Sequence, residues 1–134
     1  MKQMIAMVLV CICVLGIVGC NQQPQQVQGG QLLAEGKVIN IDISSQPKGY
    51  NYSFSGTDAK AIIDYLSTLN LESNFEEDPN LHVGMTWVIS LKYENGDDLT
   101  IYHFGEFIRA KGGSWYKMTY DEVSRFDALL DKLK

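Results

Sequence analysis

Cysteine is the most reactive side chain in this 134-residue sequence, and all three copies lie within the first twenty residues. A thiolate can act as a nucleophile, bind a metal or form a disulfide. Cys11 and Cys13 lie inside an uncharged apolar run, residues 4–19, that follows Lys2. Residues 21–134 contain no cysteine, which excludes disulfides, thiol catalysis and thiolate metal sites from that part of the chain.

The apolar run has the layout of a secretory signal peptide, with a positive charge before it and a small residue at its end. It is shorter than the roughly 20 residues that span a bilayer as a helix. Its last residues, Ile17-Val18-Gly19-Cys20, resemble the lipobox of bacterial lipoproteins. The resemblance implies cleavage between Gly19 and Cys20, so that residues 1–19 are a signal peptide. It also implies a diacylglyceryl group on the Cys20 thiol, which holds the protein on the extracytoplasmic face of a cell membrane. Two acyl chains anchor a protein stably, because each buried methylene contributes about 0.8 kcal/mol.

The two histidines are the remaining candidates for acid–base or metal chemistry. His82 follows the acidic residues 76–78, and His103 lies in an expected strand. Neither belongs to a calcium-loop pattern, and the sequence holds no Gly-x-Ser-x-Gly nucleophile elbow. We therefore expect a solvated acidic loop around His82 and a structural or surface role for His103. The sequence predicts no catalytic residue, cofactor or metal site. A small hydrolase or metal-dependent enzyme that uses His82 or His103 with nearby carboxylates is the alternative.

Aromatic residues in the expected strands offer a second kind of chemistry, which is binding. Most of them must fill the core of so small a domain. Where a sheet face stays uncovered, exposed aromatic rings beside an arginine favour an interface. Arg109, Trp115 and Tyr116 lie on neighbouring expected strands and are the candidate binding surface.

The elements that would position these residues begin after a glutamine-rich stretch. We expect residues 20–34 to be the lipidated cysteine and a flexible tether, with a typical reach of roughly 20 Å. Residues 35–134 are expected to form one domain. In size and layout this body resembles the small uncharacterised lipoproteins of Gram-positive bacteria.

Alternating apolar residues predict strands over residues 37–44 and 50–54, then 85–93 and 99–104. Asn95-Gly96 predicts a two-residue type I′ turn, which would place Leu91 opposite Thr100 and Ile89 opposite Tyr102. Trp87 would then lie opposite Phe104, and these side chains would form the core. A second hairpin is expected from residues 106–110 and 114–118, and residues 70–82 are expected to be a loop.

Two helices are expected from 3.6-residue periodicity. The first starts at Ser55 or Thr57, and the second at the capping box Thr119–Glu122. The element order is therefore β-β-α-β-β-β-β-α. It predicts an α+β domain with an antiparallel sheet of about six strands and two helices on one face.

The net charge of −5 argues against nucleic acid as a partner, because phosphate binding needs a basic surface. The sequence therefore favours a lipid-anchored, non-enzymatic module that binds an extracytoplasmic protein or small ligand.

Overall fold

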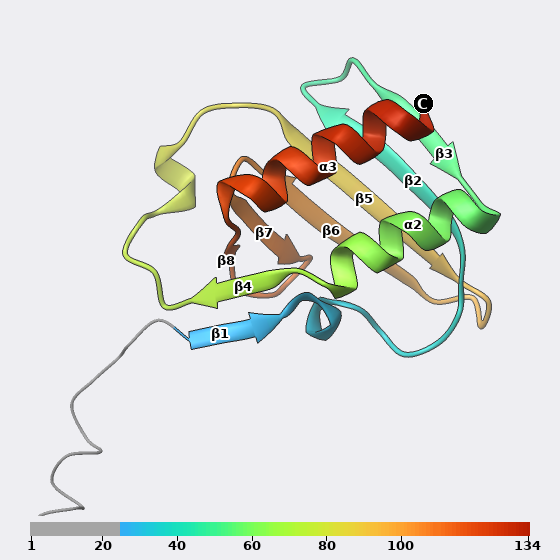
Figure 1. The fold of residues 1–134 in the computed structure, drawn as a ribbon, viewed down its shortest axis with the longest axis horizontal. Helices are drawn as coiled ribbons and strands as arrows, with labels where there is room; N and C mark the ends of the chain where they lie inside the picture. The colour runs from blue at the N-terminus through green and yellow to red at the C-terminus, as the bar shows by residue number, and fades with distance from the viewer. Residues whose placement is uncertain (1–24) are drawn as a thin grey trace, which may run out of the picture.

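The computed structural model describes residues 25–134 and shows an α+β fold (Figure 1). Its sheet has eight antiparallel strands in the order β1-β4-β8-β7-β6-β5-β2-β3. The antiparallel α+β class is confirmed, whereas the expected count of six strands is wrong. The strands are β1 (Gln25–Gln28), β2 (Val38–Gln46), β3 (Asn51–Phe54), β4 (Asn70–Ser73), β5 (Thr86–Tyr93), β6 (Asp98–Phe104), β7 (Phe107–Ala110) and β8 (Tyr116–Lys117).

Two helices, α2 (Gly56–Ser67) and α3 (Tyr120–Leu133), lie on the same face of this sheet (Figure 1). The core fills the space between them and the strands. Ile41, Ile43, Ile89, Leu91 and Ile101 reach it from the sheet, and the helices add their own apolar side chains. The helix contributions include Ile62, Leu66, Phe126 and Leu130. The opposite sheet face carries no helix among residues 25–134.

The domain begins earlier than the sequence predicts. Residues 25–28 are not part of a flexible tether, because they pair with β4 as an edge strand, with Val27 opposite Leu71. A 3₁₀ turn over Gly29–Leu32 follows and buries Leu32 in the core. Polar glutamines give no strand periodicity, so this strand depends on its distant partner rather than on its own sequence pattern. The expected signal peptide and Cys20 lie outside the described residues.

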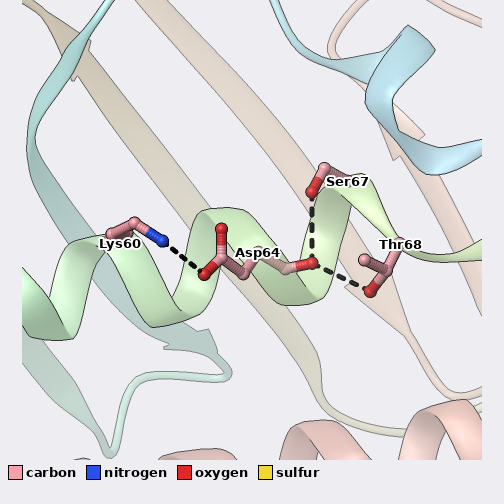
Figure 2. A network of polar contacts seen from close by, with 4 residues as sticks. All are labelled: Lys60, Asp64, Ser67 and Thr68. Atoms are coloured by element: carbon pink, nitrogen blue, oxygen red, sulfur yellow. Dashed lines mark hydrogen bonds and ion pairs between the residues drawn. The ribbon is translucent and has the colours of Figure 1, made fainter.

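Strand β4 corrects the expectation of a loop over residues 70–82. At the end of helix α2, the Asp64 carbonyl accepts hydrogen bonds from the hydroxyls of Ser67 at 3.1 Å and Thr68 at 2.8 Å (Figure 2). Lys60 pairs with the Asp64 carboxylate at 2.9 Å one turn earlier. Because the chain leaves the helix at this point, Asn70 can enter the sheet two residues later.

The hairpin between β5 and β6 differs from the expected one by a single residue. Tyr93 and Asp97 close a three-residue loop, and Gly96 alone takes a positive φ of 93°. A three-residue loop of this kind ends in a left-handed residue. Ile89 therefore lies opposite Ile101, and Trp87 opposite His103. A one-residue slip turns every side chain of a strand to the other face. Tyr102 and Phe104 thus leave the expected core, and Ile101 and His103 enter it.

The start of α3 confirms the expected capping box. The Thr119 side chain accepts from the Glu122 amide at 3.2 Å, and the Glu122 carboxylate accepts from the Thr119 amide at 3.1 Å. The other Glu122 oxygen accepts from the Asn70 amide at 2.8 Å. Glu122 therefore joins the start of α3 to the start of β4.

Candidate functional site

The sheet face opposite α2 and α3 holds a group of aromatic side chains around one arginine, most of them half-buried and Phe107 buried. Antiparallel pairing places Val88, Tyr102 and Arg109 in a row across β5, β6 and β7. Phe104 and Phe107 form the next row on the same face. None of these five belongs to the core cluster beneath the helices. Together with Trp115 they are called the Arg109 face from here on.

Arg109 is the centre of this face. Its guanidinium carbon lies 4.8 Å from the centre of the Trp115 ring and 5.2 Å from the centre of the Tyr102 ring. Both distances lie within the roughly 6 Å at which a cation is attracted to an aromatic ring. Trp115 also contacts Phe107 edge-on at 6.5 Å. The structure therefore brings together two of the three residues that the sequence singled out.

The third, Tyr116, is not part of the Arg109 face. Successive residues of a strand point to opposite sides of a sheet. Tyr116 lies opposite Ile108 and packs against the core beneath the helices. Tyr102 takes its place beside Arg109, and the sequence reasoning missed it because the expected register put Tyr102 in the core.

The loop between β4 and β5 extends the apolar surface at one end. Phe75 and His82 both lie against Phe107, with ring centres 5.5 Å and 5.1 Å away. Farther along this loop, Leu81 is 81% exposed, and Val83 and Met85 are exposed as well. A Cβ added to Gly84 would lie 3.4 Å from the Phe104 ring, so this part of the loop touches the Arg109 face.

The two histidines do not form a common site. His82 is exposed and lies against Phe107, whereas His103 is buried on the helix side of the sheet and stacks on Phe126. Within residues 25–134, no group of three or more histidine, aspartate or glutamate side chains could hold a metal ion. The carboxylates near His82 are therefore not arranged around it as ligands.

His103 takes part in a buried polar contact. The Tyr65 hydroxyl donates to the Glu122 carbonyl at 2.9 Å and lies 3.3 Å from Nε2 of His103. Because the tyrosine proton points to the carbonyl, the neutral imidazole donates from Nε2. Burial lowers the pKa of His103 to about 4. Burial, with the charge of Glu122 as a second cause, raises the pKa of Tyr65. Both groups are neutral in the folded protein at pH 7 and lie away from solvent, which suits a structural role.

Three hollows are relevant to the Arg109 face, and the smallest, of about 260 Å³, is lined in part by Phe104 and Phe107. One of about 460 Å³ is lined by Ser114, Trp115, Tyr116 and residues 73–79 at the edge of the face. Another of about 660 Å³ lies at the start of α2, between residues 36–39 and Gly56, Thr57, Lys60 and Ile63. The hollow of about 660 Å³ is mostly apolar, and the Lys60 that lines it is already paired with Asp64. The Arg109 face thus holds the more distinctive set of side chains.

Comparison of the chain with protein-family models, with curated proteins and with solved structures found no match. Among the described residues, neither helix has the length and apolar character needed to cross a bilayer.

Proposed function

We propose that this protein is a lipoprotein attached to the extracytoplasmic side of a cell membrane through a diacylglyceryl group on Cys20. Its folded part is a non-enzymatic binding module that presents the Arg109 face to a protein or small ligand. The lipobox-like residues before Cys20 support the attachment. The aromatic residues around Arg109 support the binding role.

One observation carries the binding proposal. Arg109, Tyr102 and Trp115 gather on the sheet face opposite α2 and α3. Tryptophan, tyrosine and arginine are the residues that most often dominate binding energy at interfaces. The exposed Leu81, Val83 and Met85 widen the apolar surface beside them. Large exposed apolar surfaces commonly mark interaction sites.

The early start of the domain limits how far this face can lie from the lipid. Gln25 pairs with Ser73 at the end of β4, and the loop that carries Phe75 starts immediately after Ser73. Between Cys20 and Gln25 an extended chain covers at most roughly 18 Å. This proposal therefore places the binding module close to the membrane surface, whereas a tether over residues 20–34 would also allow it to lie farther away.

Membrane fractionation tests the attachment. The wild-type chain should be found in the membrane fraction, and the Cys20→Ala variant should be found outside it. Mass spectrometry of the mature wild-type protein should show a modified cysteine at its first position. An unmodified Cys20 in a protein that still fractionates with membranes would contradict lipid attachment.

Retention on isolated cell envelopes tests the binding role separately. The Cys20→Ala chain, which cannot use lipid, should show saturable retention, and the additional change Trp115→Ala should reduce it at least tenfold. Tyr120→Ala is the matched control, because Tyr120 is an exposed aromatic residue on α3, outside the Arg109 face. Equal retention of the Trp115 and Tyr120 variants would contradict the proposal.

A further inference from the structure

The guanidinium of Arg109 is held in place by its contacts with Tyr102 and Trp115. Arginine ordinarily loses side-chain entropy when it binds a ligand. Here the two aromatic contacts already restrict the side chain, at 5.2 Å and 4.8 Å. A ligand that reaches this arginine therefore meets a planar group whose orientation is largely set.

The hydrogen-bond donors of this guanidinium have no protein acceptor. Arg109 forms no ion pair and no side-chain hydrogen bond with any residue in the described range of 25–134. Its Nε is buried without a partner. The two terminal nitrogens have no hydrogen-bond partner among these residues either. Because only Nε is a buried unpaired atom of this side chain, these two nitrogens keep access to solvent. The terminal nitrogens, and not the buried Nε, are therefore the donors that a ligand can reach.

Lys117, the neighbouring cation, already forms ion pairs, whereas Arg109 forms none among the described residues. Lys117 lies in the same sheet face and pairs with Glu77 and Glu106. The hydrogen bond to Glu77 raises the pKa of Lys117. Glu72 lies opposite Lys117 on the next strand. Because Lys117 is already paired, it offers no second free cation to a ligand at Arg109, which leaves one positive charge for a singly charged anion.

We propose that Arg109 binds the carboxylate of a ligand whose apolar part lies along Val88, Tyr102 and Phe104. This inference rests on the proposed binding function and names its ligand class. A carboxylate matches the planar donor fork of a guanidinium and carries a single negative charge. The row of Val88 and Tyr102, with Phe104 beside it, offers apolar contact within the same face. The ligand is thus an amphipathic monocarboxylate.

Tryptophan fluorescence offers a direct test, because an anion on the guanidinium would change the emission of Trp115. The full chain in nonionic detergent is titrated at pH 7 with cyclohexanecarboxylate, acetate, inorganic phosphate and sodium chloride at matched ionic strength. We expect a saturable change with cyclohexanecarboxylate, at least fivefold tighter than with acetate, and none with chloride. Trp115→Phe should abolish the change, because Trp87 lies on the helix side of the sheet, against Phe126.

Substitutions of Arg109 test whether its guanidinium binds the carboxylate. Arg109→Gln should weaken cyclohexanecarboxylate binding at least tenfold. Arg109→Lys, which keeps the charge and loses the planar fork, should weaken it several-fold. Lys111→Gln is the matched control and should bind as the wild type does, because Lys111 is an exposed cation in the turn after β7. Circular dichroism verifies that each variant is folded.

Three results would overturn the inference. They are an equal response to chloride, unchanged binding by folded Arg109→Gln and Arg109→Lys proteins, and a phosphate response as strong as that to cyclohexanecarboxylate. If envelope retention still depends on Trp115 in such a case, the carboxylate ligand is wrong and the binding function stands. If retention does not depend on Trp115, the binding function itself fails.

Discussion

The His103 ring stacks on the Phe126 ring with centres 4.2 Å apart and planes inclined by 23°. This contact joins β6 to α3 on the covered side of the sheet. It follows from the one-residue change in register that places Tyr102 on the uncovered side. The same shift therefore buries a histidine in the core and adds a tyrosine to the Arg109 face.

Burial of His103 makes the stability of the protein depend on pH. The unfolded histidine titrates near pH 6.5, and the folded one has a pKa of about 4. Between these values the unfolded state binds more protons, so stability falls as pH falls. The contribution of neutral His103 to the free energy of unfolding is fully present above pH 6.5 and is lost as the pH falls to 4. It amounts to roughly 3 kcal/mol.

Urea unfolding at several pH values between 4 and 7 measures this effect. The His103→Leu variant should lose the part of the pH dependence that His103 supplies, whereas His82→Ala should keep it, since His82 is exposed. Carboxylates also titrate in this range, so the difference between variant and wild type is the informative quantity. Parallel pH profiles for His103→Leu and the wild type would show that the buried histidine does not titrate as proposed.

Glu122 links two elements through its two carboxylate oxygens, and its removal should be costly. Glu122→Ala leaves the Asn70 amide without its 2.8 Å acceptor and breaks the capping box of α3. The lost hydrogen bond costs about 1 kcal/mol, because Asn70 is exposed and water can replace the acceptor, and the lost cap adds about 1 kcal/mol. Asp121→Ala is the matched control, because Asp121 is an exposed acid in the same helical turn. Equal losses of unfolding free energy in both variants would rule out this role for Glu122.

Two adjacent glycines test whether the domain begins at Gln25. A Cβ on Gly29 would lie 2.0 Å from the Leu66 carbonyl oxygen, whereas the nearest atom to a Cβ on Gly30 is 3.8 Å away. We expect Gly29→Ala to loosen the 3₁₀ turn and β1, and Gly30→Ala to be tolerated. Hydrogen exchange at Val27 and Leu71 reports on this pairing. Similar protection of these amides in both variants would indicate that β1 does not depend on the close approach.

Local signals in the sequence were sufficient for several elements. The capping box and the apolar stripe of α3 are complete within one segment, and the first hairpin shows clear alternation in both strands. Strands β1 and β4 lack such signals, because a four-residue strand with one central apolar residue, Val27 or Leu71, resembles a loop. Only their mutual pairing, across more than forty residues, reveals them.

The Arg109 face could be predicted only in part for a related reason. Asn95-Gly96 fits a two-residue turn and also the end of a three-residue loop, since Gly96 adopts a positive φ in both. Turn chemistry alone does not choose between them, and the choice decides whether Tyr102 faces the core. Arg109 and Trp115 were found because they precede and follow a clear turn, whereas the side on which Tyr116 points depended on the register of β8.

Covalent footprinting of the full chain tests most directly whether the Arg109 face is the binding surface of a membrane-attached protein. Labelling of tryptophan and tyrosine side chains is compared between protein in intact envelopes and purified protein in detergent. Trp115 and Tyr102 should be protected several-fold in the envelope, while the exposed Tyr120 on α3 should label equally in both states. Equal labelling of Trp115 and Tyr102 in the two states would contradict the account.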